Sequence, residues 1–296
     1  MDGVLIIDKP EGLTSHDVVA AARRALKEPR IGHTGTLDPL ATGVLPLAIG
    51  RATRLVRFLT SSDKDYDATI RFGVATDTYD ITGAEVSRTD RVPSREEVSR
   101  AVESLRGDYL QVPPAFSAKK VDGRRAYEQA RRAEPVALAP APVRVSRADI
   151  ADVTGAQARI SITCSAGFYV RSFAHALGEL LGTGACLEAL RRTRSGDFTL
   201  DAALALDAIQ DAGRVEAALV TMDRLLPRFP AVQVTPQGRR FVHHGRELRP
   251  GDFEPIGGSA PRNPPYVRIL DDRGVLLALG TAGHSPGSLH PAVVLV

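Results

Sequence analysis

The sequence predicts an α+β protein, in which a mixed, mainly antiparallel sheet is flanked by helices and followed by a small C-terminal β-rich domain. Segments with apolar residues at every second position are typical of half-buried strands, and segments with apolar residues three or four positions apart are typical of helices. From about residue 230, short apolar runs are separated by Pro and Gly, which favours a second, β-rich region. We therefore expect one domain over residues 1–229, built around one sheet, and another over 230–296.

Strand and helix patterns alternate at the start of the chain. Residues 4–7 are a continuous apolar run and predict a buried strand. Ser15 is expected to cap a helix that ends before Pro29. Residues 44–49 predict another strand, which Pro46 should confine to a sheet edge or a bulge because proline has no N–H to donate.

The middle of the chain repeats this alternation. Residues 66–74 predict a half-buried antiparallel strand with Tyr66 on its apolar face. Residues 94–106 predict a helix, and 159–164 a further strand. Another helical pattern follows that strand directly, so Arg171 should lie on the first turn of a helix.

Composition narrows the class of protein. Of the 296 residues, 43% are hydrophobic and 25% charged, which is ordinary for a soluble globular protein. The apolar run at 4–7 is too short for a signal peptide or a membrane span, so we expect a cytoplasmic protein without membrane contact. The net charge of +3 suits an anionic partner without requiring one. Cys164 and Cys186 have no zinc-site spacing and are expected to be reduced core residues, so no metal is implied.

The most informative segment is the glycine-rich stretch 32–43, GHTGTLDPLATG. Asp38 is its only carboxylate, and Pro39 stiffens the chain directly behind it. A loop of this kind can hold one acid in an otherwise uncharged cleft, as a nucleophile or a general base requires. The alternative is a turn in which Asp38 bonds only its own backbone.

Continued to Thr53, this stretch resembles the signature of the TruB family of pseudouridine synthases. Further matching blocks follow in the family's order over roughly residues 3 to 200. These blocks are residues 64–66 (KDY), 76–80 (TDTYD), 111–120 (QVPPAFSAKK) and 167–171 (GFYVR).

The resemblance implies a pseudouridine synthase-like fold with a C-terminal PUA-like RNA-binding domain. It also implies an isomerase that converts uridine 55 in the T-loop of tRNA to pseudouridine, with Asp38 acting covalently on the nucleoside. Whether Asp38 attacks the sugar C1′ or only promotes elimination stays open. The reaction involves no net redox change or hydrolysis, so no cofactor is expected. A stacked loop hides the reacting bonds, so the uridine must be flipped out. The resemblance implies that His33 fills the vacated space; otherwise His33 is a solvated turn residue.

The other site residues follow from the same blocks. Arg171 is expected to pair with Asp38 and keep it ionised, although a surface arginine at a helix start is the alternative. Tyr66 is expected to stack on the target base, or else to be an ordinary strand aromatic. Tyr169 could hydrogen-bond within the Asp38–Arg171 pair or simply pack, and Leu190 would form an apolar wall of the pocket or belong to the core.

Basic clusters support RNA binding independently. The first contains Lys119, Lys120, Arg124, Arg125, Arg131 and Arg132, and it matches the family's RNA-gripping insertion, here about residues 117–140. The second contains Arg191, Arg192 and Arg194, and the third Arg239, Arg240, His243, His244 and Arg246. Each could also be a solvated face. The acids of segment 76–83, Asp77 and Asp80, are interpreted as turn caps and not as a cation site.

The sequence therefore predicts a monomeric enzyme that binds the T-stem-loop of tRNA and needs no obligatory protein partner. Two alternatives remain. One is a guide-dependent enzyme of the same superfamily, or one acting on another RNA. The other is a non-catalytic RNA-binding or RNA-folding module in which Asp38 is a turn residue.

Overall fold

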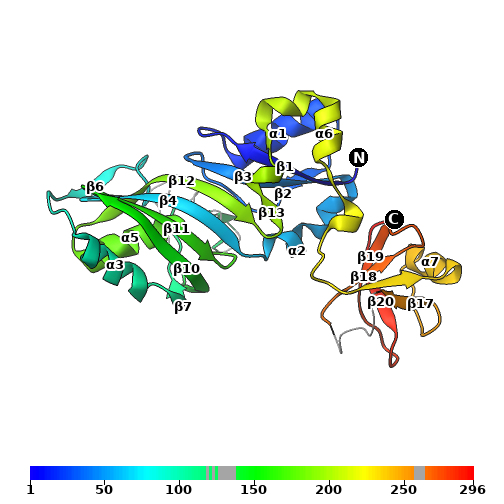
Figure 1. The fold of residues 1–296 in the computed structure, drawn as a ribbon. Helices are drawn as coiled ribbons and strands as arrows, with labels where there is room; N and C mark the ends of the chain where they lie inside the picture. Colours follow the sequence, from blue (N-terminus) through cyan, green and yellow to red (C-terminus); the bar gives the residue numbers. More distant parts are fainter. Residues whose placement is uncertain (118–119, 122–123, 126–137, 257–263) are drawn as a thin grey trace.

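The computed structural model describes residues 1–117, 120–121, 124–125, 138–256 and 264–296, with the backbone alone for 120–121 and 124–125. Its main sheet has 11 strands in the order β14-β1-β3-β12-β4-β11-β10-β7, with β13, β15 and β2 paired to β12, β1 and β3. Most pairs are antiparallel, while β1–β14 and β3–β12 are parallel. The predicted α+β class and mainly antiparallel sheet are confirmed (Figure 1).

The strands of the main sheet are β1 (Gly3–Lys9), β2 (Ile31–His33), β3 (Ala41–Ile49), β4 (Lys64–Phe72), β7 (Gly107–Gln111), β10 (Ala141–Thr154), β11 (Gln157–Cys164), β12 (Ala185–Ser195), β13 (Phe198–Thr199), β14 (Leu204–Ala205) and β15 (Val220–Thr221). Two short hairpins lie outside it, β5 (Val74–Thr76) with β6 (Glu85–Arg88), and β8 (Lys120–Val121) with β9 (Arg124–Arg125). The helices are α1 (Ser15–Leu26), α2 (Val56–Thr60), α3 (Arg95–Ser104), α5 (Val170–Leu181), α6 (Ala212–Ala218) and α7 (Pro236–His243), with 3-10 turns η1 (Gly50–Leu55), η2 (Leu200–Ala202), η3 (Leu206–Gln210) and η4 (Met222–Arg224).

Strands β1 and β3 are buried on both faces, which explains their continuous apolar sequence. On β1, Leu5 and Ile7 pack into a core with residues of α1, α3 and α5. Val4 and Ile6 point the opposite way, into a second core shared with the C-terminal region. One strand therefore anchors both halves of the molecule.

Strand β3 is not an edge strand, so the prediction for Pro46 is wrong. It lies between β1 and β12 in the sheet. On the β12 side, however, β12 pairs only with Ala41 to Gly43, and β2 pairs only from Leu47 onward. Pro46 lies in the gap between these two partners, where no ladder bond is required of its nitrogen.

Helix α1 begins one position earlier than its predicted cap. Thr14 is the N-cap, and Thr14 and Asp17 form a reciprocal capping box. Ser15 is the first helical residue, is 1% exposed, and its hydroxyl has a different role, described below. The other predicted strands and helices of the first 182 residues are present, and α5 ends at Gly182 in the left-handed conformation.

The C-terminal region forms a separate five-stranded sheet in the order β17-β16-β18-β19-β20 (Figure 1). Its strands are β16 (Ala231–Val234), β17 (Phe253–Ile256), β18 (Val267–Leu270), β19 (Leu276–Ala282) and β20 (Leu289–Val294). Helix α7 packs against this sheet and was not predicted. Its sequence is rich in basic residues and has no apolar periodicity to indicate a helix, since Val242 is its only apolar side chain that is fully buried.

Two further expectations concern single features. Cys164 and Cys186 are both buried and free, as predicted. None of the helices in the described ranges is long and apolar enough to span a membrane.

Candidate active site

The loop that carries Asp38 is fixed by hydrogen bonds to both of its sides. Ser15 Oγ accepts from the amide of Leu37 at 2.8 Å and donates to the carbonyl of Leu37 at 3.1 Å. The amide of Ala41 donates to the carbonyl of Asp38 at 3.0 Å, and the amide of Gly12 to that of Pro39 at 2.8 Å. The backbone on either side of Asp38 is therefore held by other elements, which a merely local turn would not need.

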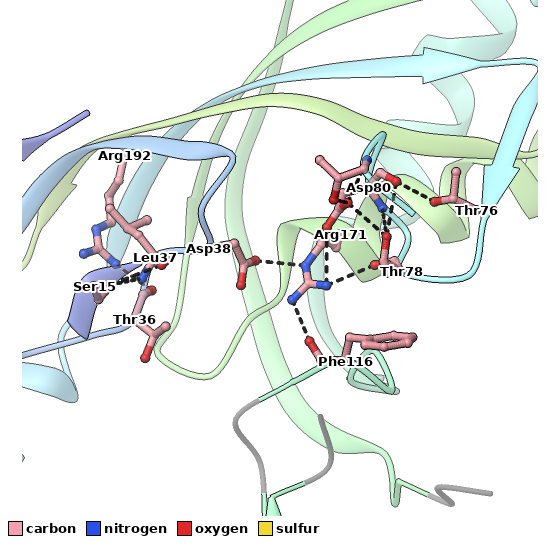
Figure 2. A network of polar contacts seen from close by, with 11 residues as sticks. Ser15, Thr36, Leu37, Asp38, Thr76, Thr78, Asp80, Phe116, Arg171 and Arg192 are labelled. Atoms are coloured by element: carbon pink, nitrogen blue, oxygen red, sulfur yellow. Dashed lines mark hydrogen bonds and ion pairs between the residues drawn. The ribbon is translucent and has the colours of Figure 1, made fainter. Parts of the chain in front are cut away.

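Asp38 forms an ion pair with Arg171, from the first turn of α5. Arg171 Nε lies 2.9 Å from Asp38 Oδ2, and the Arg171 side chain is 6% exposed (Figure 2). Its remaining nitrogens donate to the carbonyls of Thr78 at 3.0 Å and Phe116 at 2.9 Å. The guanidinium is thus held from three directions and presents Nε to Asp38. The pairing expected between the two residues is present.

Asp80 completes this group, and the sequence interpretation missed it. Asp80 Oδ2 lies 3.5 Å from Arg171 Nη1 with its side chain 7% exposed. Its other oxygen accepts from the Thr78 hydroxyl at 2.9 Å, the Thr82 amide at 3.0 Å and the Thr82 hydroxyl at 2.6 Å. Asp80 is therefore both a turn cap, as interpreted, and an ion-pair partner of Arg171. In the described residues no group of three or more potential metal ligands is present.

The electrostatics of Asp38 combine opposing effects. Burial raises the pKa of Asp38, the neighbouring positive charge of Arg171 lowers it, and the negative charge of Asp80 raises it. Arg171 is therefore the group that favours the ionised carboxylate. The protonation of Asp38 is therefore sensitive both to the Arg171 guanidinium and to the buried Asp80 carboxylate.

Asp38 opens into a cavity of about 300 Å³. The sequence-predicted residues Tyr66, Tyr169, Arg171 and Leu190 line it together with Asp38, although they come from β4, β12 and the start of α5. Its other walls include Lys64, Phe168, Ser117 and Arg192. The cavity lining therefore combines apolar and aromatic side chains with the basic side chains of Lys64, Arg171 and Arg192.

Tyr66 and Tyr169 differ in their surroundings. Tyr66 is 8% exposed, and burial raises the pKa of its hydroxyl while the charge of Arg192 lowers it. Tyr169 is fixed through its backbone, which exchanges two hydrogen bonds with the Gln111 side chain. Within the described residues its hydroxyl makes no hydrogen bond to Asp38 or Arg171, so the contact considered for it is not formed here.

His33 lies at the end of β2 and does not line this cavity. Its ring packs edge-to-face against His16, with the centroids 5.5 Å apart. Burial lowers the pKa of His33 to about 4, so the ring is neutral at pH 7. A neutral ring near the cavity loop is suited to stacking, because it carries no charge that would have to be desolvated.

Two arginines of the second basic cluster are partly exposed but form ion pairs, and the third is buried. Arg191 pairs with Asp8 at 2.8 Å and Arg194 with Asp65 at 2.7 Å. Arg192 is 1% exposed and lines the cavity. Sequence reasoning missed its role because alternating positions on a strand point to opposite faces, and the strand itself was not predicted.

The first basic cluster lies largely outside the described residues. Lys119, Arg131 and Arg132 fall outside them. Lys120, Arg124 and Arg125 belong to the β8–β9 hairpin, of which only the backbone is described. The expected insertion at 117–140 is accordingly a prediction from the sequence.

Comparison with known families gives two matches along the chain. Residues 23–170 match the TruB family pseudouridylate synthase (N terminal domain), and residues 171–227 match the tRNA pseudouridylate synthase B C-terminal domain.

Curated proteins named tRNA pseudouridine synthase B are similar over nearly the whole chain. The one from Solibacter usitatus (strain Ellin6076) is 44% identical over 299 residues and covers 100% of both chains. The one from Mycobacteroides abscessus is 43% identical over 279 residues, covering 92% of this chain and 93% of the relative.

Among solved structures, a chain in the crystal structure of the archaeal box H/ACA sRNP Nop10-Cbf5 complex has a TM-score of 0.75 at 24% identity. It covers 99% of this chain and 86% of its own. This likeness establishes a shared fold.

Proposed function

The chain belongs to the TruB family of pseudouridine synthases, which makes it a tRNA-modifying isomerase, and we propose that it acts on uridine 55 of the T-loop with Asp38 as the reacting carboxylate. The observation that carries the assignment of Asp38 is its ion pair with the buried Arg171, at 2.9 Å, beside a cavity that opens to solvent. Arg171 orients this carboxylate and favours its ionised form against the effect of burial, as covalent action on a nucleoside requires.

In this proposal the target uridine is flipped out of the T-loop and enters the cavity. Tyr66 stacks on the uracil, Leu190 forms the apolar wall opposite, and Tyr169 closes the side next to Arg171. His33, on the neighbouring strand end, fills the space that the base leaves. The cavity volume of about 300 Å³ supports this, because it matches one nucleoside more closely than a longer segment of RNA.

The rest of the chain supplies RNA contacts. We propose that residues 1–229 form the catalytic domain and 230–296 a PUA-like RNA-binding domain; the separate sheet beginning at Ala231 supports this boundary. Exposed Arg240 on α7 provides positive charge there, whereas the neighbouring Arg239 lies 3.6 Å from Asp271. We further propose a monomer that works on tRNA in the cytoplasm without an obligatory protein partner.

Replacing uridine C5–H by C5–³H in a tRNA transcript gives a direct test of the reaction. The label is released only when C5 forms its bond to the sugar and loses its hydrogen. We expect the wild type to release tritium and Asp38→Asn to release none, with tRNA affinity within a few-fold because phosphate contacts dominate binding. Substantial turnover by Asp38→Asn would remove Asp38 from this role. Tight binding without release by the wild type would favour the RNA-binding alternative.

A second measurement addresses the C-terminal region. Arg240→Glu should weaken tRNA binding and lower the dependence of log Kd on log salt by about one unit per lost contact. An unchanged salt dependence would remove α7 from the RNA interface.

A further inference from the structure

Arg192 occupies a position in the cavity that the pair of Asp38 and Arg171 does not explain. It lies on β12 directly opposite Tyr66 on β4 in the strand register. Facing residues of antiparallel strands have their Cβ atoms about 4.5–5.5 Å apart, on the same face of the sheet. Both residues line the cavity that contains Asp38. A base stacked on Tyr66 would therefore have Arg192 at its edge.

The hydrogen bonds of Arg192 leave its charge unneutralised. Nε donates to the carbonyl of Val44 at 2.7 Å, Nη2 to that of Gly35 at 3.1 Å and Nη1 to that of Thr36 at 3.4 Å. Arg192 also forms a side-chain hydrogen bond with the Tyr66 hydroxyl. All four of these partners are uncharged, so they hold the guanidinium without cancelling its charge. Within the described residues no carboxylate lies in ion-pairing distance of Arg192, whereas Arg171 has two.

This arrangement is costly for a folded protein. A charge that is buried without an opposite charge loses the favourable hydration that it has in water. Anchoring three carbonyls explains the geometry but does not require a cation, because neutral donors could satisfy them at a lower cost. Figure 2 shows Arg192 on one side of segment 36–38 and Arg171 on the other, so the free positive charge lies across Asp38 from the neutralised one.

We propose that Arg192 stabilises the negative charge that develops on uracil as it leaves the sugar. This inference rests on the proposed function. When the C1′–N1 bond breaks, its electron pair departs with the base and spreads over N1, O2 and O4. The sugar carbon is taken by a carboxylate oxygen of Asp38, or becomes part of a double bond after loss of the C2′ proton. Uracil leaves as the same anion in both paths, so the role of Arg192 does not depend on which is followed.

A preorganised donor aimed at developing charge typically contributes about 10²–10³-fold to a rate. The charge is then consumed when C5 of the rotated base bonds to C1′. This displaces the Asp38 oxygen in the first path and is completed by return of a proton to C2′ in the second. The C5 proton is then lost and N1 takes up a proton. Arg192 therefore acts between the two bond-forming events, and Arg171 acts before them by keeping Asp38 ionised.

The test varies the leaving group together with the residue. Fluorine at C5 withdraws electrons and stabilises the uracil anion, so a 5-fluorouridine substrate should depend less on Arg192. Fluorine cannot leave as a cation, so this substrate stops as the rearranged C-glycoside, which is separated from 5-fluorouridine by nucleoside chromatography. Single-turnover loss of uridine and of 5-fluorouridine from T-stem-loop transcripts is measured with each enzyme preparation.

For Arg192→Gln we expect conversion of uridine to slow by about 10²–10³-fold and conversion of 5-fluorouridine to slow at least about tenfold less, with transcript affinity retained. The ratio of the two rates is taken on one preparation, so a partly unfolded fraction cancels. Arg192→Lys, which keeps the charge, should lose less on uridine than Arg192→Gln does. Arg71→Gln is the matched control, because Arg71 carries the same charge on β4 but pairs with Glu188 outside the cavity. Its ratio should equal that of the wild type.

The outcomes separate the inference from the function on which it rests. Equal slowing of Arg192→Gln on both substrates would show that Arg192 only supports the loop, and would overturn the inference while the function stands. A wild type that converts neither transcript would overturn both.

Discussion

The two arginines that border the Asp38 cavity are neutralised to different degrees. Arg171 faces Asp38 and Asp80 and is held by two carbonyls, so its charge serves to tune a carboxylate. Among the described residues Arg192 meets three carbonyls and the Tyr66 hydroxyl, all uncharged, so its charge is left for something that enters the cavity. Burial of an arginine therefore does not by itself indicate its role. The groups that surround it decide whether it acts on the protein or on the substrate.

Of the changes considered, removal of the Arg171 charge should have the largest effect on the rate. In Arg171→Met, Asp38 loses the group that lowers its pKa, so the acidic limb of the pH–rate profile should move to higher pH. The maximal rate should fall by about 10³-fold, because the carboxylate also loses its orientation. Single-turnover rates from pH 5 to 9 measure both quantities. An unmoved acidic limb would mean that Arg171 does not control the ionisation of Asp38.

A substitution at Gly43 tests the close packing of β3 against β12, where Gly43 is paired with Arg192. Gly43 has φ +99°, and a Cβ there would lie 2.2 Å from the Arg192 carbonyl oxygen. We expect Gly43→Ala to lower the free energy of unfolding by about 3 kcal/mol, from strain together with the collision. Gly12→Ala is the control, because Gly12 has φ +85° with no atom within 4 Å of the added Cβ. Its cost should be only about 1–2 kcal/mol of strain. Urea unfolding compares the two, and equal costs would show that the contact between β3 and β12 relaxes freely.

Asp80→Asn should move the pH–rate profile in the direction opposite to the shift expected for Arg171→Met. Asn keeps an oxygen that can accept from Thr78 and Thr82, but it removes a negative charge that raises the pKa of Asp38. The acidic limb should therefore move to lower pH, with a loss of about tenfold in maximal rate from the weaker hold on Arg171. A shift in the same direction as that of Arg171→Met would contradict the assigned network.

The smallest expected effect concerns Lys9, a third buried cation near Asp38. It donates to the carbonyls of Pro10 and Leu13, and burial lowers its pKa from 10.5 to about 8. The unfolded chain therefore binds more protons between these values, so stability should rise as pH increases through this window. Between pH 8 and 9 the wild type should gain about 1 kcal/mol relative to Lys9→Met. Parallel unfolding curves of the two proteins at both pH values check this, and an identical pH dependence would mean that Lys9 stays protonated throughout.

The sequence predicted features that depend on residues within one element better than features that depend on contacts between distant segments. Capping residues and apolar periodicity act within one element, so α3, α5, β4 and β11 were found at nearly their observed bounds. The cap of α1 was misplaced because Thr14 and Ser15 are both suitable, and only the distant loop at Leu37 decides which one faces it.

The site was predicted where a motif is contiguous and missed where it is assembled across strands. Asp38, Tyr66 and Arg171 each lie in a recognisable block and meet in the cavity. Asp80 looked like a turn acid, because its second oxygen is explained only by a helix about 90 residues later in the chain (171 against 80). Arg192 looked like one of three surface arginines, because the pairing of β12 with β4, which includes irregularities in register, cannot be obtained from local composition.

The position of β12 between β3 and β4 has a consequence for how the enzyme is made. Val44 meets its partner Arg192 only after a further 148 residues have been synthesised. Until then the Asp38 loop of the nascent chain lacks its contacts with the guanidinium groups of Arg171 and Arg192, because both residues are synthesised much later than Asp38. Contacts so distant in sequence close slowly and together. We therefore expect the emerging amino-terminal half to be inactive, and catalytic competence to arise late in folding, once β12 is inserted between β3 and β4.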